Sequence, residues 1–340
     1  MQHSPSESRR FGLNVYRADL ETLDEESLLR ELFSRRADLA IVRLPAVEQH
    51  RLPRLDRVGL PYVVADTLVY YFADLKKLTI PAPRNPELEF VEIDEALAPA
   101  LDELVAEIFG AYVNHYASNP LLRRGDAVAG YREWARGFVR GNAEKKIAWL
   151  VRRGGAAIGF CTCAERGDTG IGVLYGIRAS ASGGGIYGDM IRFTSSQYQQ
   201  RGFATMEVST QVHNFAVQKV WSREGFAMQK AMVTVHVNAL FDVSARPPEK
   251  ISLAAGDDLA GALARCHEKI FPSAIARTQR FAHLAPLPPS GELIVTFPIV
   301  DESNGHVRSV AKLADARGEL CLLAYSELFV RSLATTRGPS

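Results

Sequence analysis

The chain has neither a long hydrophobic run nor an excess of charge of one sign. Residues 60–71 form one of its longest apolar stretches, but this stretch includes polar residues and is too short to span a bilayer. The 340 residues carry 40 Lys and Arg against 39 Asp and Glu, which gives a net charge of +1. Because no surface of one sign is implied, we expect neither a membrane nor a nucleic acid as a partner.

Cysteines and targeting signals are also scarce. The sequence has four cysteines, and Cys161 and Cys163 alternate along one predicted strand instead of following the spacing of a metal knuckle. We expect the four to be small buried apolar side chains, and we expect no metal site. Residues 1–10 are polar and lack the apolar core of a secretory signal, so a cytoplasmic location is favoured. We expect this segment to be a disordered tail.

Length and composition indicate a globular protein of several domains. The chain exceeds the size of one ordinary core, and its apolar share of 47% is typical of folded proteins. Proline-containing stretches at residues 76–86 and 240–249 separate the segments with periodic hydrophobicity. We therefore expect three domains, over residues 11–80, 87–240 and 250–333.

The expected fold class is α/β, with α+β character in the last domain. Hydrophobic periodicity predicts a small βαβαβ unit first, followed by a mixed sheet with flanking helices. In the first domain the strands are expected at 11–18, 37–45 and 60–74 and the helices at 25–36 and 46–59. In the second domain the strands are expected at 88–93, 146–154, 156–167, 171–177, 203–212 and 226–238, and the helices at 94–112, 127–141, 186–202 and 214–226. The helix at 94–112 is expected to be amphipathic, with Leu101, Leu104, Ile108 and Tyr112 on its apolar face.

The sequence pattern of the third domain predicts one helix and long strands in which apolar and polar residues alternate. The helix is predicted over 258–271, after a short strand within 250–258, and three strands follow at 291–300, 306–318 and 319–333. One helix with long antiparallel strands is typical of a hot-dog-like half-barrel, and a generic α+β domain fits the pattern equally well. Exposed edges of such strands favour a homodimer.

The segment 169–226 carries the strongest indication of function. An apolar strand at 171–177 leads into the small-residue loop 179–185, and a helix follows. Glycines let a backbone approach a ligand closely, and the free N–H groups at a helix start point at an anion, so this arrangement is typical of a phosphate site. No Gly-Lys-Ser/Thr follows, which excludes a kinase-type phosphate loop. A plain flexible turn is the alternative for the loop taken alone.

The residues after this loop carry a second motif. The sequence STQVHNFAVQKVWSREGF at 209–226 resembles the closing motif of the Gcn5-related N-acetyltransferase superfamily, in which a strand ends in T-Q-x-x-N and a helix N-x-x-A-x-x-x-Y ends in Gly-Phe. The glycine-rich loop also lies where that superfamily holds the pyrophosphate of coenzyme A. The resemblance covers about residues 11–238. Within the superfamily it is greatest to the enzymes that acetylate dTDP-linked 4-amino-4,6-dideoxyhexoses.

This resemblance implies a bound acyl-CoA, in the first place acetyl-CoA, as co-substrate and no metal. The cofactor would enter where two neighbouring strands splay apart. Backbone N–H groups from the loop into the helix would bind the pyrophosphate, and the strand before the loop would pair with the pantetheine arm. The residues implied in cofactor binding are Ile177, Ser182, Gly183, Gly184, Gly185, Ile186, Tyr187, Gly188, Asn214 and Trp221.

The sequence departs from the family pattern at three positions. Ser182 stands where the superfamily usually has Arg or Gln, and Tyr187 stands where it has a small residue. Trp221 occupies the position of the tyrosine that protonates the leaving thiolate, and an indole N–H does not deliver its proton. Either another residue protonates the thiolate, or the thiolate leaves unassisted, or the domain binds thioesters without turnover. Tyr175, before the loop, is our candidate catalytic replacement, with Tyr187 as a second.

The acceptor site is expected in the polar connection 113–126. A sugar ring needs amide and hydroxyl donors and an aromatic face, and this connection supplies all three. His115 titrates near neutrality and is the candidate general base for the amine. Arg123 would pair with the diphosphate of a nucleotide sugar. For both residues an ordinary solvated side chain is the alternative. The residues implied in acceptor binding are Asn114, Tyr116, Asn119, Arg123 and His213.

The expected function is therefore the transfer of an acetyl group from acetyl-CoA to the amine of a nucleotide-linked amino sugar. A first alternative keeps the fold but takes the acyl group from an acyl carrier protein, and both Trp221 and the third domain favour it. A second alternative is a protein that binds acyl-CoA or a sugar nucleotide without catalysis.

Overall fold

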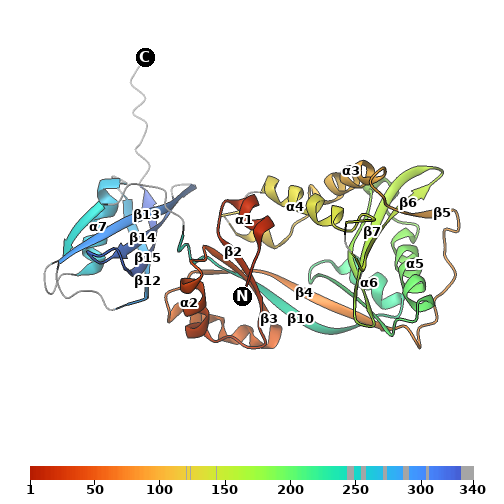
Figure 1. The fold of residues 1–340 in the computed structure, drawn as a ribbon, viewed down its shortest axis with the longest axis horizontal. Helices are drawn as coiled ribbons and strands as arrows, with labels where there is room; N and C mark the ends of the chain where they lie inside the picture. Colours follow the sequence, from red (N-terminus) through yellow and green to blue (C-terminus); the bar gives the residue numbers. More distant parts are fainter. Residues whose placement is uncertain are drawn as a thin grey trace, which may run out of the picture. The chain divides into compact units, whose positions relative to one another are not determined.

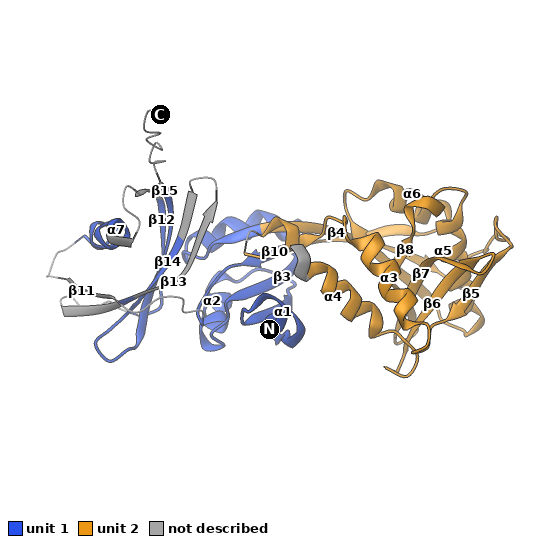
Figure 2. Ribbon diagram, turned by 90° about the horizontal axis from the view of Figure 1, so that it is seen from above, with its two compact units in different colours: residues 1–63, 235–340 blue, residues 64–234 orange. Residues whose placement is uncertain are grey.

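The protein is a mixed α/β chain, analysed as a computed structural model. The structure describes residues 1–119, 121–122, 124–142, 144–242, 249–253, 258–270, 274–285, 291–303 and 306–330. Backbone contacts divide the chain into two compact units, unit 1 with residues 1–63 and 235–340 and unit 2 with residues 64–234 (Figure 2). The three-domain division expected from the sequence stays a prediction.

Unit 2 is built on a mixed sheet with the strand order β10-β4-β9-β8-β7-β6-β5. Its strands are β4 Tyr62–Asp74, β5 Leu88–Glu92, β6 Lys146–Arg153, β7 Ala156–Arg166, β8 Thr169–Ile177, β9 Thr205–Gln211 and β10 Ala227–Val237. Its helices are α3 Ala98–Phe109, α4 Arg124–Arg136, α5 Ile186–Gln200 and α6 Phe215–Arg223, with short 3₁₀ turns η2 His115–Ser118 and η3 Ala179–Ala181. The division between the units falls inside β4 and β10.

Two apolar cores lie on opposite faces of this sheet. Successive strand residues point to opposite faces, so Trp149 of β6 packs with α5 and α6, whereas its neighbour Leu150 packs with α3 and α4 (Figure 1). Both Cys161 and Cys163 of β7 belong to the α5 side. All four cysteines are buried and unbridged, as the sequence predicted.

Helix α3 is shorter than its sequence pattern suggested. Leu101 and Leu104 are fully buried, as expected for the apolar face of the helix, and Val105 is buried with them. The helix nevertheless ends at Phe109, with Gly110 as its C-cap, and the segment that follows leaves the helical path. Tyr112 therefore lies beyond the helix and not on its buried face, which matters for the site described below.

Unit 1 contains two groups of elements. The first has the strand order β1-β2-β3 and comprises β1 Gln2–His3, α1 Pro5–Phe11, β2 Val15–Asp19, α2 Glu25–Ser34, β3 Leu39–Pro45 and the 3₁₀ helix η1 Ala46–Asp56. The second comprises β11 Glu249–Leu253, α7 Leu259–Ile270, β12 Ala274–His283, β13 Gly291–Ser303, β14 His306–Ala314 and β15 Leu320–Val330. Within the described residues no helix is both long and apolar enough to cross a membrane.

The expectation of a disordered segment at residues 1–10 is wrong. Strand β1 pairs with β2, and helix α1 begins with Pro5 in its first turn, where a missing N–H is harmless. Glu7 is buried in α1 and accepts two hydrogen bonds from Arg17, with both N–O distances at 2.6 Å. This ion pair ties the polar segment to the sheet, a long-range contact that composition alone does not show.

Residues 46–59 also differ from their prediction, because η1 is a 3₁₀ helix and not an α-helix. Pro53 lies inside it. A proline ring clashes with the carbonyl four residues earlier in an α-helix and offers no N–H, so the segment takes the tighter form with its different hydrogen bonds.

The C-terminal part of unit 1 is one helix packed on a five-stranded antiparallel sheet. The strand order is β11-β13-β14-β15-β12. Leu263 and Cys266 of α7 pack in one core with Val295, Leu313 and Leu322 of the strands. Strand β12 was not expected, because its Arg, Thr and Gln residues hide the alternation. The α+β architecture is as predicted, and the closer hot-dog likeness stays a prediction.

Candidate functional site

The two parallel strands of unit 2 part along their length. Strands β8 and β9 pair from Thr169 with Thr205 as far as Gly172 with Val208, although β8 continues to Ile177 and β9 to Gln211. Beyond this point β8 remains paired with β7, and β9 remains paired with β4. The facing edges of β8 and β9 are therefore open toward each other at their C-terminal ends, which is the parting that the resemblance implied.

The glycine-rich loop follows directly at the end of β8. Gly183, Gly184 and Gly185 have φ angles of +97°, +61° and +89°, a region that side chains with a Cβ rarely adopt. Within the described part of the chain, their three amides donate no hydrogen bond to any acceptor. Gly185 is also the N-cap of α5, a helix of 15 residues. Free amides beside a helix start form a site for an anion.

One side of this loop is bordered by the segment that connects β4 to β5. Asn85 Nδ2 donates to the Gly184 carbonyl at 3.1 Å, and a Cβ at Gly185 would meet the Arg84 side chain at 3.0 Å. A Cβ at Gly183 would meet nothing within 4 Å, and Ser182, Gly183 and Gly184 are exposed. The loop is thus supported on one side and open to solvent on the other.

The predicted residues around this loop have different surroundings. Ser182 Oγ donates to the Ala179 carbonyl at 2.8 Å and holds the turn before the glycines. Ile186 is buried in the core between α5 and the sheet. Gly188 lies inside α5 where α6 approaches, and a Cβ there would be 3.1 Å from Glu224 Oε1. Gly188 therefore permits close packing of two helices, and its predicted cofactor contact stays a prediction.

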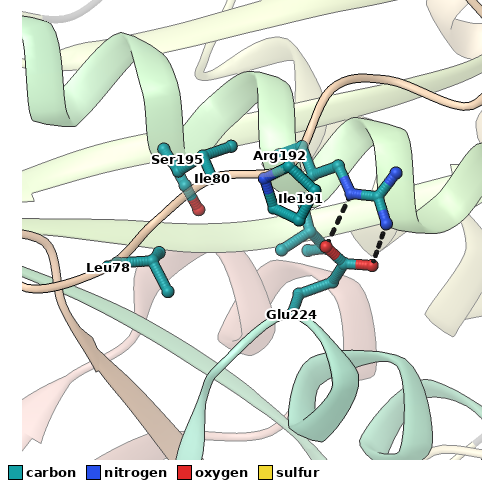
Figure 3. A pocket seen from close by; sticks show the side chains of 7 residues that line it. Leu78, Ile80, Ile191, Arg192, Ser195 and Glu224 are labelled. Atoms are coloured by element: carbon teal, nitrogen blue, oxygen red, sulfur yellow. Dashed lines mark hydrogen bonds and ion pairs between the residues drawn. The ribbon is translucent and has the colours of Figure 1, made fainter.

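A buried ion pair joins those two helices. Arg192 donates to both carboxylate oxygens of Glu224 at 2.7 and 2.8 Å (Figure 3). It also donates to Asp189 at 3.0 Å. The crevice beside this pair is closed: it has no volume that admits a water molecule. It is lined by Leu78, Ile80, Pro81, Ile191, Arg192, Ser195 and Glu224. The arrangement fixes α5 against α6 and is not itself a binding site.

Tyr175, our candidate acid, points to the α5 side of the sheet. Its hydroxyl donates to Thr194 Oγ1 at 2.9 Å and lies 3.1 Å from Cys163 Sγ. Burial raises the pKa of Tyr175, and Cys163 beside it raises the pKa further. Because this hydroxyl is enclosed in the core on the α5 side of the sheet, the geometry favours a packing role, and a catalytic role for Tyr175 stays a prediction.

Tyr187 and Trp221 lie in the same core. Burial raises the pKa of Tyr187, whose ring is 6.1 Å from that of Tyr175. Trp221 is 3% exposed and packs against Tyr71 of β4 at 5.4 Å between ring centroids. Its indole N–H meets no acceptor with hydrogen-bond geometry in the described part of the chain. This donor is buried beside the Tyr187 hydroxyl, and the indole lowers the pKa of that hydroxyl in part.

A polar cluster occupies the end of the opening at β9. The Tyr112 hydroxyl donates to Gln211 Oε1, and it lies within hydrogen-bonding reach of Thr210 and Asn214. Asn214 Nδ2 donates to Thr210 Oγ1 at 3.1 Å. Asn214 holds the N-cap position of α6, yet its side chain makes no capping bond. Its amide therefore faces the strand end, where the resemblance placed a pantetheine contact.

Sequence reasoning did not single out Tyr112, Thr210 or Gln211 as site residues. Tyr112 was assigned to the buried face of a helix predicted over 94–112, and α3 ends before it. Gly110, a residue that weakens a helix, was the available signal for that earlier end. Thr210 and Gln211 lay inside the quoted motif, but their neighbours come from elements distant in sequence.

The predicted acceptor residues lie together in the turn η2. Asn114 Oδ1 accepts from the Tyr116 amide at 2.9 Å, and Asn119 Oδ1 accepts from the Leu121 amide at 3.1 Å. His115 is 9% exposed, and its ring lies 4.0 Å from that of Tyr116. Both amide oxygens thus shape the turn itself.

The remaining predicted residues are placed as follows. His213 is exposed between β9 and α6, and its carbonyl accepts from the Phe215 amide at 2.9 Å. Ile177 ends β8 opposite Gly159. Arg123 lies outside the described residues. Across the described chain no three His, Cys, Asp or Glu side chains gather so as to hold a metal ion.

Comparisons with known proteins gave distant similarities. No family model matches the chain. The spore coat polysaccharide biosynthesis protein SpsD of Bacillus subtilis is 24% identical over 205 residues, which span 59% of this chain and 66% of SpsD. The chain thus covers just under two thirds of that relative.

Solved structures were also compared. A GCN5-related N-acetyltransferase from Sphaerobacter thermophilus has a TM-score of 0.42 and 16% identity, covering 62% of this chain and 64% of that one. A GCN5-related N-acetyltransferase from Kribbella flavida has a TM-score of 0.43 and 13% identity, covering 64% of this chain and 77% of that one.

Proposed function

We propose that unit 2 is an N-acyltransferase that moves an acetyl group from acetyl-CoA to the amine of a nucleotide-linked amino sugar. One observation carries this proposal: three free amides at Gly183–Gly185 lie at the end of β8, where β8 and β9 part. A diphosphate needs such amides, and an extended arm attached to it needs an unpaired strand edge. The two features adjoin in this fold.

Other groups of the chain would bind the pantetheine arm and deprotonate the amine. The free edge of β8 up to Ile177 would pair with the amides of the pantetheine arm. Asn214 and the indole N–H of Trp221 would donate hydrogen bonds along the same path. Acetyl-CoA, when bound, supplies a thioester that an amine can attack. An amine attacks only when neutral, and we assign its deprotonation to His115, with His213 as the second candidate base.

The sugar acceptor is supported by two further observations. Asn114, Tyr116 and Asn119 bring amide and aromatic groups into one turn, which suits the polar edges and apolar faces of a sugar ring. The similarity to SpsD, named for spore coat polysaccharide biosynthesis, points to the same class of substrate. Arg123 is the proposed partner of the nucleotide diphosphate.

An acyl carrier protein is the alternative donor, and the absence of a proton donor at Trp221 favours it. A carrier protein presents the same pantetheine arm, but it lacks the nucleotide. A homodimer through unit 1 and a cytoplasmic location stay predictions.

The proposal is tested by thiol release and by binding. Calorimetry with coenzyme A is expected to show one site, and acetyl-CoA with a panel of nucleotide-linked amino sugars is expected to release free thiol with at least one of them. His115→Ala should lower turnover by about 10²-fold or more, which is the usual loss of rate when a general base is removed. Tight coenzyme A binding without thiol release from any acceptor would favour the non-catalytic binding protein. Release only from a loaded carrier protein would favour the carrier-dependent enzyme.

A further inference from the structure

The reaction proposed above needs a proton donor for the departing sulfur, and the candidates considered are the hydroxyls of Tyr175, Tyr187 and Tyr112. Tyr175 already bonds to Thr194 and lies against Cys163. Tyr187 packs in the core on the α5 side, next to Tyr175. The third hydroxyl, that of Tyr112, donates to Gln211 Oε1 at the end of β9, and a thiolate that binds there would take the place of this acceptor.

The position of Tyr112 follows from the parted strands. Residues 206 and 208 of β9 face the α5 core, so alternation places Thr210 on that face and Gln211 on the opposite one. The Tyr112 hydroxyl reaches side chains of both residues, and it also reaches Asn214 at the start of α6. A hydroxyl that contacts both faces of one strand end lies at the edge of that strand, and this edge is the one left unpaired by β8.

The ring of Tyr112 is held in this position by its neighbours. Phe109 and Tyr131 pack against it edge to face, with centroid distances of 5.4 and 6.3 Å. The backbone turn after α3 is closed by the Tyr112 amide, which donates to the Phe109 carbonyl at 3.2 Å. The hydroxyl is therefore presented by a fixed ring, as a group that transfers a proton must be.

We propose that Tyr112 is the proton donor to the leaving thiolate, in place of the family tyrosine that Trp221 replaces. This assignment rests on the proposed acyltransferase function. An arm that starts at Gly183–Gly185 and enters between β8 and β9 passes Thr210 and Gln211 before it reaches the last strand pair, Gly172 with Val208. Tyr112 meets the arm on this path.

The chemical step balances without any further reactant. The amine nitrogen bonds to the acyl carbon, the carbon–sulfur bond breaks, and its electron pair stays on sulfur. Tyr112 gives its phenolic proton to that sulfur. The proton lost by the nitrogen returns through solvent to the phenolate, so the sum is one amide and one thiol. Burial, with the nearby Asp66 carboxylate as a smaller cause, raises the pKa of Tyr112, which keeps the phenol protonated at neutral pH.

The first test is Tyr112→Phe, which keeps the ring and removes the proton. We expect kcat with acetyl-CoA to fall by about 10²-fold, which is the usual loss of rate when a general acid is removed. The KM for acetyl-CoA should change little. The defect should shrink when the thioester carries a more acidic thiol, because such a thiolate leaves without a proton. Tyr198→Phe, which removes a buried hydroxyl bonded to the Ala164 carbonyl, is the matched control and should keep parental kcat.

The second test needs no turnover. Calorimetry of the parent is expected to show tighter binding of coenzyme A than of desulfo-coenzyme A, and Tyr112→Phe should remove most of that difference. Parental kcat in Tyr112→Phe, or a defect that is the same for every leaving thiol, would overturn the role of Tyr112 while the acyltransferase itself stands. A parent protein that binds coenzyme A but releases no thiol from acetyl-CoA would overturn both.

Discussion

The two sheets of this chain use their strand edges differently. In unit 1, β14 and β15 pair from His306 with Phe329 to Ala314 with Leu320, almost their whole length. In unit 2, β8 and β9 pair over four residues and then separate. Strands β14 and β15 therefore pair with each other throughout, whereas β8 and β9 leave facing backbone groups unpaired with each other beyond Gly172 and Val208. The comparison shows that the end of strand pairing distinguishes the candidate site in unit 2 from the continuous pairing of β14 and β15 in unit 1.

Both units bury ionisable groups, and unit 1 contains the Glu7–Arg17 pair described above. Unit 2 pairs Arg192 with Glu224 and Asp189 beside its open loop. In unit 1, His236 and His267 are buried, and burial lowers the pKa of each to about 4. The ion pair of unit 2 fixes α5 against α6, and the two histidines belong to a closed interior.

The largest expected effect comes from breaking the ion pair next to the opening. Glu224→Gln removes a carboxylate that is 9% exposed and leaves the Arg192 guanidinium undercompensated. The free energy of unfolding should fall by about 3 kcal/mol, measured by chemical denaturation. Glu103→Gln, which removes the carboxylate of an exposed pair with Arg178, should change it by less than about 0.5 kcal/mol. Equal effects would mean that the buried pair has no special part in fixing α5 to α6.

A smaller effect is expected in unit 1 on acidification. His236 and His267 stay neutral in the folded chain above about pH 4, whereas in the unfolded chain they take up protons below about pH 6.5. The unfolded state then binds more protons, so stability falls as the pH drops through this window. Between pH 7 and 5 each histidine should cost about 2 kcal/mol.

Denaturation curves of histidine variants at the two pH values check this prediction. His267→Gln should weaken the pH dependence, whereas His50→Gln, at an exposed position, should not. An unchanged pH dependence in His267→Gln would show that its burial does not control the acid sensitivity of unit 1.

The smallest expected effect distinguishes the glycine loop from an ordinary turn. Gly184 and Gly167 share a φ of +61°, and a Cβ added at either position would meet no atom closer than 4.0 Å. An alanine at either site should cost about 1–2 kcal/mol of stability through the same backbone strain. Coenzyme A affinity, measured by calorimetry, should fall about tenfold in Gly184→Ala alone, which corresponds to about 1.4 kcal/mol. Equal affinity in both variants would remove the loop from the proposed site.

Local patterns predicted much of unit 2. The strand expected at 171–177, the helix at 186–202 and the helix at 214–226 correspond to β8, α5 and α6 within a few residues. Each has strong periodicity and a clear glycine boundary, signals that act over neighbouring residues. The loop between β8 and α5 was predicted for the same reason, since consecutive glycines leave few other conformations.

Contacts between distant residues could not be predicted. The hydroxyl of Tyr175 was expected near a ligand, and only the fold shows that Thr194 of α5 already engages it. Tyr112 was taken as a core residue, and only the early end of α3 moves it to the strand opening. The same holds for α1, whose anchor is the pair of Glu7 with Arg17. Sequence periodicity shows which face a residue prefers, but not which partner it meets there.

The hydrogen bonds of the Asp189 carboxylate offer a way to measure anion binding at the candidate site. This carboxylate accepts hydrogen bonds from the backbone amides of Arg84 and Asn85, both at 2.9 Å, and so ties the connecting segment to the first turn of α5. Deuterium uptake at these two amides tracks how firmly that turn is held. An anion captured by the adjoining glycines would slow this uptake, so occupancy could be followed by mass spectrometry without any label on the ligand.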